Sequence, residues 1–499
     1  MRMQLKGDYF DGQWHHPGKP DEVVPKTSPA DSTKLLWEAP IWHAHPAAAI
    51  NSAVHGFAAW RVLSFDERAV YFRRYQEAVK KRADEIAQAI AWEVGKPLWE
   101  SKTEATALTS KVDVTLADSL DRIRPRVLKE VMPKIDGQTL HKPLGVTVVI
   151  GPFNFPCHLA NGQILSALIA GNSVVFKPSE KTVYSAQLMM ECFAEAGFPK
   201  GVVNMVNGTG RNAARLTQDP RVRGVFFTGS RAVGKMILRD TNQDLKKMVA
   251  LELGGKNTTI VHGDAHLPHA LPELLRACYL TTGQRCTSTS LVLVQRSVLA
   301  AFREQFQAVV ERIIVDHPVE KTPFMGPLID AHAEQAYFDF CALGVQAGAE
   351  VLVAPRKLEL PWSGHYVSPS LHLWERPDPA HPFFQDEIFG PNACIVPYDT
   401  IDEAIQLANA TEYGLAASVF TRNAVVWQQC LRDVQAGLIN LNRSTVGATA
   451  RLPFGGVKDS GNFRPAAVSM VDHCVNAVAS LETTDDTSSR LADVVGLKD

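Results

Sequence analysis

The sequence of 499 residues lacks the cysteine pattern of a disulfide scaffold or a zinc site. Its eight cysteines are scattered, with no C-x-x-C pair and no Cys/His cluster at the spacing of zinc ligands. Long apolar runs are missing too, because residues such as Pro152 and Gly171 interrupt them well before membrane-spanning length. We therefore expect no disulfides, no bound metal and no transmembrane helix.

An excess of charge of one sign is also missing. The chain has 51 Lys and Arg against 53 Asp and Glu, and its basic residues are dispersed. This balance favours neither a nucleic-acid partner nor a membrane surface. The first residues, MRMQLKGDYFDGQW, carry charges and lack the apolar core of a signal peptide, so we expect a cytoplasmic protein. At this length, two or three domains are expected.

Helical and strand patterns alternate along the chain. The capping box Ser64 and Glu67 and the stop signals Gly95 and Pro97 enclose apolar residues at helical spacing, which predicts a long amphipathic helix. From about residue 145, the short apolar runs GVTVVI, NSVVF, GVVNMV, GVFFT and VALEL are separated by helical segments. This alternation predicts an α/β fold with a parallel, doubly wound sheet, followed by a second βα region over about 258–440.

Polar residues follow four of these predicted strands. GVTVVI runs into GPFNFP with Asn154, and NSVVF runs into KPSE with Lys177 and Glu180. GVFFT precedes GSRAVGK, and VALEL contains Glu252 just before a glycine pair. Because parallel sheets of this kind bind ligands at the carboxyl ends of their strands, we expect these loops to carry the chemistry.

The loop GSRAVGK resembles a phosphate-binding P-loop in all but its last position. That position is Met236, whose thioether cannot supply the hydroxyl that binds Mg²⁺, so nucleotide hydrolysis is disfavoured. Gly229, Ser230 and Gly234 still predict an anion site of backbone N–H groups at a helix start. The nearby GTGRNA fits a dinucleotide fingerprint, but no acidic residue closes the next strand, so a tight turn before a helix is the better interpretation.

Cys286 lies among small and hydroxyl-bearing residues in TTGQRCTSTS. A lone cysteine is more often a small buried hydrophobe than a nucleophile. A thiolate and a dinucleotide together would suit aldehyde oxidation, since thiolate addition gives a tetrahedral oxyanion that can release hydride and leave a thioester. That reaction needs a base and a neutral oxyanion donor, for which Glu252 and Asn154 are candidates. Each alone also fits a surface glutamate or a turn-forming asparagine.

Seven motifs resemble those of the aldehyde dehydrogenase superfamily in the same order and at similar spacing over nearly the whole chain. They are GPFNFP, FKPSE, FTGS, LELGGKN, GQRCT, DEIFGP and PFGG. The resemblance implies a Rossmann-like NAD-binding domain, an α/β catalytic domain and a small β extension that joins subunits into a homodimer or homotetramer. The implied boundaries are 1–122 with 142–253, 254–452, and 123–141 with 466–487.

The same resemblance assigns roles to individual residues. It implies Cys286 as nucleophile, Glu252 as general base, and Asn154 with the Cys286 backbone N–H as oxyanion hole. The cofactor-binding residues it implies are Lys177, Glu180, Gly229, Ser230, Gly234, Glu387 and Phe389. A carboxylate at position 180 accepts hydrogen bonds from ribose hydroxyls but repels a 2′-phosphate, so we expect NAD rather than NADP.

Three further segments resemble the bacterial succinylglutamate-semialdehyde dehydrogenases of arginine catabolism, namely HLANGQILSALIAGN, NRSTVGATARLPFGG and SGNFRPAAVSMVDHCVNAVASLE. Family members have a Lys-Pro pair near NRST, where this chain has Arg443 and Ser444. The implied substrate, N-succinyl-L-glutamate 5-semialdehyde, has two carboxylates, so we expect Arg285, Arg443 or Arg451 to bind one of them. The alternative is NAD(P)-dependent oxidation of another semialdehyde or of glyceraldehyde 3-phosphate without phosphorylation. A non-catalytic scaffold is disfavoured because Cys286, Glu252 and Asn154 are all present.

Overall fold

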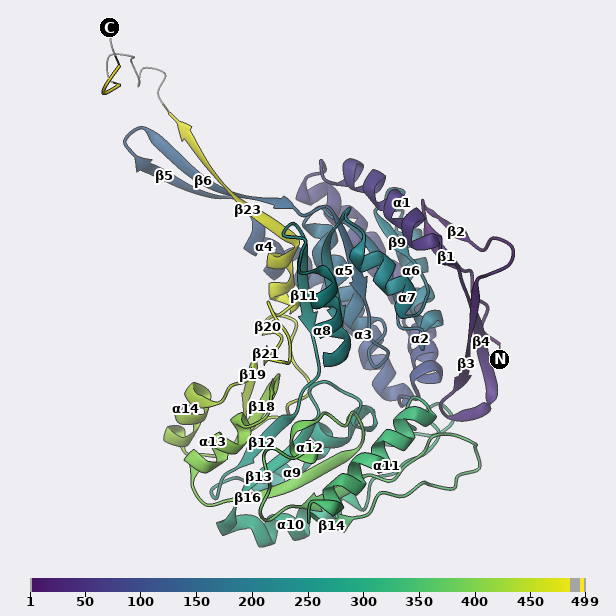
Figure 1. The fold of residues 1–499 in the computed structure, drawn as a ribbon, viewed down its shortest axis with the longest axis vertical. Helices are drawn as coiled ribbons and strands as arrows, with labels where there is room; N and C mark the ends of the chain where they lie inside the picture. Colours follow the sequence, from purple (N-terminus) through teal and green to yellow (C-terminus); the bar gives the residue numbers. More distant parts are fainter. Residues whose placement is uncertain (1, 485–493, 498–499) are drawn as a thin grey trace.

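The computed structural model describes residues 2–484 and 494–497, which form two large sheets and a small projecting one (Figure 1). The first sheet has the strand order β11-β10-β7-β8-β9-β1-β2, in which β11 to β9 are parallel and β1 and β2 antiparallel. Its parallel strands are apolar because helices cover both faces of the sheet. The strands are β1 (Asp8–Phe10), β2 (Gln13–His15), β7 (Val146–Ile150), β8 (Ser173–Lys177), β9 (Val203–Met205), β10 (Val222–Thr228) and β11 (Met248–Glu252).

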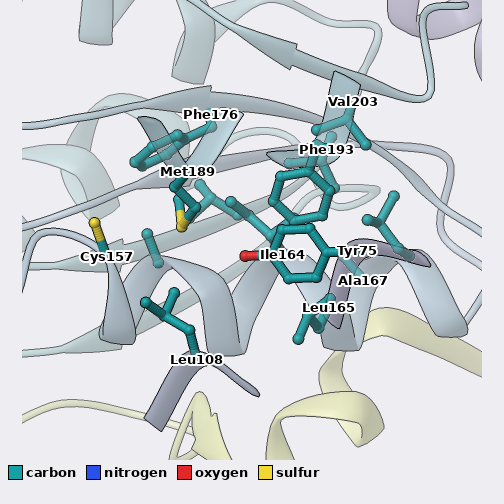
Figure 2. Packing of buried hydrophobic residues seen from close by; sticks show 14 of the residues in the cluster. Tyr75, Leu108, Cys157, Ile164, Leu165, Ala167, Phe176, Met189, Phe193 and Val203 are labelled. Carbon is teal, nitrogen blue, oxygen red and sulfur yellow. The ribbon is translucent and has the colours of Figure 1, made fainter. Parts of the chain in front are cut away.

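The helices around this sheet include the long one expected from the sequence. That helix is α2, whose capping box at Ser64 and Glu67 forms and whose C-cap is Gly95 with φ 80°. Figure 2 shows part of the core beneath it, where Tyr75 and Phe193 stack with ring centroids 4.0 Å apart. The helices are α1 (His45–Trp60), α2 (Phe65–Val94), α3 (Leu98–Val114), α5 (His158–Ile169), α6 (Val183–Glu195), α7 (Gly210–Gln218) and α8 (Arg231–Thr241).

The second large sheet has the order β14-β15-β16-β13-β12-β18-β19 and is parallel except for its edge strand β14. Its strands are β12 (Asn257–Val261), β13 (Thr289–Gln295), β14 (Glu350–Val353), β15 (Ser370–Leu373), β16 (Asn392–Tyr398), β18 (Ala416–Phe420) and β19 (Leu438–Leu441). Its helices are α9 (Leu267–Tyr279), α10 (Arg296–Val310), α11 (Ala331–Gln346), α12 (Pro382–Gln385), α13 (Ile401–Asn409) and α14 (Ala424–Asp433).

A three-stranded sheet of β5 (Arg126–Met132), β6 (Ile135–Pro143) and β23 (Val475–Thr483) projects from the body of the molecule (Figure 1). The chain thus returns near its end to pair β23 with β6. The expected extension 123–141 with 466–487 overlaps this sheet, but its residues 485–487 lie outside the described residues. The domain boundaries stay predictions. No helix in 2–484 or 494–497 is long and apolar enough to cross a membrane.

Shorter elements complete the fold. A two-stranded sheet near the N-terminus pairs β3 with β4, while β17 pairs with β21 and β20 with β22. A π-helical turn continues α3 before the short helix α4. The bounds are β3 (Glu22–Ser28), β4 (Asp31–Ile41), η1 (Thr115–Ser119), α4 (Leu120–Ile123), η2 (Leu280–Gly283), β17 (Tyr413–Gly414), β20 (Pro453–Phe454), β21 (Val457–Lys458), β22 (Ala466–Ala467) and η3 (Val468–Cys474).

Candidate active site

Four neighbouring strands of the first sheet end at one cavity. The carboxyl ends of β11, β10, β7 and β8 supply Glu252, Ser230, Asn154 and Lys177 to its lining. The cavity has a volume of about 600 Å³, and Cys286 reaches it from the second sheet's side. The structure therefore brings the polar loops after the predicted strands together with the candidate thiol.

Glu252 ends β11 as a buried carboxyl group with an exposure of 1%. Neither of its carboxyl oxygens has a hydrogen-bond partner among the described residues. Burial raises the pKa of Glu252 well above its usual value, because the charged form loses its hydration without gaining a partner. A carboxyl group with a raised pKa binds a proton more readily than an exposed one, which suits a general base.

The loop that carries Cys286 has a left-handed backbone just before the thiol. Thr281 and Thr282 have φ values of 56° and 57°, which side chains with a branched Cβ rarely adopt. Glu100 of α3 accepts hydrogen bonds from the Thr281 backbone N–H and hydroxyl, and Asn257 Nδ2 donates to the Cys286 carbonyl at 2.7 Å. These contacts hold the loop in its strained conformation.

Cys286 lies between two cavities. Besides the first, it lines a second cavity of about 310 Å³ together with Phe155, His158 and Lys111. Its residue is partly exposed, while the other seven cysteines are buried. Burial, followed by the Glu252 and Glu387 carboxylates, raises the pKa of the thiol. A nucleophile here can be reached by one ligand from each side.

Asn154 joins the loop that follows β7 to the loop that carries Cys286. It is 3% exposed, and its Nδ2 donates to the carbonyl of Gln284 at 3.0 Å. An amide nitrogen has two N–H groups, and the second has no acceptor among the described residues. That N–H is available to an oxygen bound near Cys286.

The wall of the first cavity fits a dinucleotide by the chemistry of its donor set. Lys177 is buried with its Nζ 3.5 Å from Glu180 Oε2, and burial lowers its pKa while Glu180 opposes the shift. Ser230 caps α8 by accepting from Val233 N–H at 3.4 Å, and both residues line the cavity, so the N-terminus of α8 lies at its wall. Apolar side chains, among them Met236 and Ile237, complete this wall. The charged pair can bind ribose hydroxyls, the start of α8 can bind a pyrophosphate, and the apolar side chains can contact an adenine ring.

Gly234 and Gly229 have different surroundings. Gly229 lines the first cavity, whereas Gly234 faces the chain that follows β11. A Cβ added at Gly234 would lie 2.6 Å from Leu253 Cδ2. Gly234 therefore allows α8 to pack closely beside Glu252's strand.

Glu387 and Phe389 line the first cavity together with Cys286. Glu387 Oε1 accepts a hydrogen bond from Gly255 N–H at 2.9 Å, and burial raises the pKa of Glu387 to about 7. A Cβ added at Gly254 would lie 2.0 Å from Glu387 Oε2, so a side chain at this position would displace the Glu387 carboxyl group. Phe389 has φ 53° and packs edge-on against Phe153.

The three arginines proposed as substrate anchors differ in their surroundings. Arg285 lines the second cavity, but its guanidinium pairs with Glu100 and donates to the Thr281 hydroxyl at 2.8 Å. Arg451 is exposed and pairs with an aspartate at 2.7 Å, and Arg443 is exposed. Neither Arg443 nor Arg451 is among the described residues that line this cavity.

Sequence reasoning missed the polar face that α3 turns toward the site. Glu100, Glu104 and Lys111 are each 2% exposed. Glu104 Oε1 accepts from the backbone N–H groups of Cys157 and His158 at the start of α5. No motif marks these residues, and their only local signal is a spacing of four and seven along one helix face.

Comparison with known families decides to which family the chain belongs. The model of the "Aldehyde dehydrogenase family" matches residues 14–478. The chain belongs to the aldehyde dehydrogenase family. The family resemblance inferred from the sequence is thereby confirmed.

Individual relatives and solved structures agree with this assignment. The N-succinylglutamate 5-semialdehyde dehydrogenases of Chromobacterium violaceum and Legionella pneumophila are each 36% identical to this aldehyde dehydrogenase, covering 95% and 96% of it and 96% and 95% of their own lengths. A mutant of the Thermus thermophilus 1-pyrroline-5-carboxylate dehydrogenase has a TM-score of 0.90 at 26% identity, covering 96% of this chain and 93% of its own. A Thermus 1-pyrroline-5-carboxylate dehydrogenase with bound NAD has a TM-score of 0.89 at 27% identity, with the same coverage. The predicted α/β fold of the family is confirmed.

Proposed function

We propose that this aldehyde dehydrogenase oxidises N-succinyl-L-glutamate 5-semialdehyde to N-succinyl-L-glutamate, with NAD as hydride acceptor and water as oxygen donor. The observation that carries the reaction type is the position of Cys286 between two cavities, one suited to a dinucleotide and one to a small aldehyde. The relatives named for this substrate, which match nearly the whole chain, support the choice of aldehyde.

Cys286 acts as the nucleophile in this proposal. Its sulfur, as the thiolate, adds to the aldehyde carbon, and the carbonyl oxygen becomes an oxyanion in a thiohemiacetal. The free N–H of Asn154 and the Cys286 backbone N–H stabilise that oxyanion. When NAD is bound, it accepts the hydride that leaves this carbon, and a thioester to Cys286 remains.

Glu252 completes the reaction as the general base. It removes a proton from a water molecule, whose oxygen attacks the thioester carbon and releases the carboxylic acid and the Cys286 thiolate, and Glu252 then releases its proton to solvent. Its buried, unpartnered carboxyl group supports this role, since burial raises its pKa and makes it a stronger proton acceptor than an exposed glutamate.

The first cavity is the proposed NAD site. Lys177 and Glu180 bind the adenine ribose, Gly229 and Ser230 bind the pyrophosphate, and Gly234 fixes the position of α8. Glu387 and Phe389 contact the nicotinamide end. Glu180 favours NAD because its carboxylate, with a side chain 41% exposed at the cavity wall, would face the 2′-phosphate of NADP.

The assembly and the compartment are further proposals. The projecting sheet leaves all of β5 exposed, including Val127 and Leu128, which supports pairing with a second copy in a homodimer or homotetramer. The eight free cysteines, one of them the proposed nucleophile, support a reducing compartment such as the cytoplasm. The anchoring of a substrate carboxylate by Arg285, Arg443 or Arg451 rests on their sequence positions, and only Arg285 lines the second cavity.

A panel of aldehydes tests the proposed function. We expect NADH to appear fastest, by kcat/KM, with N-succinylglutamate 5-semialdehyde, compared with succinate semialdehyde, glyceraldehyde 3-phosphate and propanal. Cys286→Ala should abolish NADH formation yet leave NAD binding and the thermal midpoint nearly unchanged, because removing one sulfur loses little burial. Faster turnover of another aldehyde would refute the substrate, and an active Cys286→Ala variant would refute the mechanism.

A further inference from the structure

Three buried or partly buried cations lie on or near α3, of which Arg285 and Lys111 line the second cavity, and two of the three are paired. Lys96 Nζ lies 2.7 Å from Glu104 Oε2, with both side chains fully buried. Arg285 pairs with Glu100. Lys111 has no carboxylate within ion-pair distance in the part of the chain that the structure describes. Buried charges are normally paired, so Lys111 differs from Lys96 and Arg285 in having no carboxylate partner among the described residues.

Lys111 is buried and lines the second cavity. The residue is 2% exposed, and its Nζ donates one hydrogen bond, to the carbonyl of Ala467 at 2.9 Å. Both residues line the second cavity together with Cys286. A side chain added at Gly162 would meet only Lys111 within 4 Å, with its Cβ 3.6 Å from Lys111 Cε, so the lysine stem crosses an open part of the wall.

The charge of Lys111 is therefore poorly compensated in the free protein. Burial lowers the pKa of Lys111 to about 8, against the opposing effects of Cys474 and Asp118. Asp118 is itself bound by Arg451 at 2.7 Å. An ammonium group has three donors, so after the bond to Ala467 two remain for an anion in the cavity.

We propose that Lys111 binds a carboxylate of the aldehyde substrate, remote from the carbon that Cys286 attacks, and so selects carboxylated semialdehydes over neutral aldehydes. The inference deepens the proposed function and rests on it only for the identity of the aldehyde. It assigns the anchoring role to Lys111 because, of the two cations that line the cavity, Lys111 has no carboxylate partner among the described residues. The other, Arg285, is already paired with Glu100.

The test compares substrates that differ in charge on the same enzyme variants. The kcat/KM of Lys111→Met, Lys111→Arg and Lys102→Met is measured with N-succinylglutamate 5-semialdehyde, succinate semialdehyde and propanal. Lys102→Met is the matched control, because Lys102 lies on the exposed face of the same helix with its side chain 56% exposed. A lost charge-assisted hydrogen bond should lower kcat/KM of Lys111→Met on both carboxylated aldehydes about 10- to 100-fold, mainly through KM.

Propanal oxidation should change little in Lys111→Met, Lys111→Arg should keep part of the preference, and Lys102→Met should match wild type. Equal losses on propanal and the carboxylated aldehydes would overturn the proposal, as would a changed sedimentation coefficient of Lys111→Met, which would make a second copy the missing partner. A wild-type enzyme that prefers succinate semialdehyde, with the Lys111 effect intact, would refute the substrate assignment and leave the role of Lys111 standing.

A binding measurement covers the case in which Lys111→Met folds poorly. Glutarate should slow alkylation of Cys286 by iodoacetamide in the wild type and in Lys111→Arg, but not in Lys111→Gln. Protection by glutarate that is unchanged in Lys111→Gln would overturn the proposal.

Discussion

Glu252 combines two properties that are seldom found together in a residue that serves only the fold. It is almost fully buried, and its carboxyl oxygens have no partner within residues 2–484 and 494–497. Burying a polar group without hydrogen bonds costs free energy, so this carboxyl group lowers the stability of the fold. The arrangement is explained when water, substrate or cofactor occupies the space in front of the carboxyl group during turnover.

Replacing Glu252 by Gln tests its proposed role as a base in the second half of the reaction. Glutamine keeps the size and the hydrogen-bonding capacity but cannot take up a proton. We expect a first-turnover burst of NADH in stopped-flow experiments, while steady turnover falls about 100-fold or more. Glu304→Gln, at an exposed position, is the control. If burst and turnover disappear together, Glu252 activates the thiol instead.

The pH dependence of the free energy of unfolding of Glu252→Gln tests the raised pKa of Glu252. Between the usual pKa near 4.5 and the raised folded-state value, the folded protein binds more protons at Glu252 than the unfolded chain. The free energy of unfolding therefore falls as pH rises through this window, by up to about 1.4 kcal/mol per pH unit. In urea titrations, Glu252→Gln should be more stable than wild type at pH 7 and lose this advantage toward pH 4.5. A constant difference would contradict the raised pKa.

At the scale of elements, α3 supports both catalytic loops. Glu100 holds the loop of Cys286, and Glu104 accepts the first backbone N–H groups of α5, which follows the Asn154 loop. The two glutamates are one helical turn apart, so a single helix face fixes the distance between nucleophile and oxyanion donor. The strained backbone at Thr281 persists because this helix supplies its hydrogen bonds.

Glu100→Gln tests this support. The substitution leaves the partly buried Arg285 without its carboxylate, so we expect unfolding to need about 3 kcal/mol less and kcat to fall as the Cys286 loop relaxes. The double variant Glu100→Gln, Arg285→Gln should recover part of the stability, since no unpaired charge remains. Lys102→Gln on the exposed face is the control. Urea denaturation and initial rates measure both effects, and additive losses in the double variant would contradict the coupling.

Elements with local signals could be predicted from the sequence, whereas the α3 face could not. The capping box of Ser64 and Glu67 and the C-cap Gly95 define the two ends of α2 through residues that lie at those ends. The site's strand-end residues could be found for a similar reason, since each lies at or just after the end of an apolar run. Lys111, in contrast, contacts Ala467 across 356 residues, and Glu100 contacts Thr281 across 181. Such contacts depend on the packing of the whole chain and leave no pattern near either residue.

At the scale of the whole molecule, the two large sheets supply different parts of the reaction. The first sheet contributes Glu252, Asn154 and the dinucleotide-binding wall through the ends of adjacent strands. Cys286 comes from the loop before β13 of the second sheet. Because each sheet has its own core, the cavities form where the two meet, which is a common position for small-molecule sites.

The projecting sheet predicts association with a second copy of the chain, because an exposed edge with apolar side chains is unusual for a chain that acts alone. Val127 and Leu128 of β5 are 56% and 58% exposed, and Leu481 of β23 is 59% exposed. In the described residues, β5 pairs on one side only, with β6.

We infer that this sheet buries these side chains against a second copy. Leu128→Lys should then lose about 1–2 kcal/mol of association, which raises the dissociation constant about tenfold in sedimentation velocity. Leu245→Lys, at a site that is also exposed but distant along the chain, should sediment like wild type. A wild-type enzyme that sediments as a monomer at every concentration would refute the proposed assembly, since the exposed edge would then have to be tolerated without a partner.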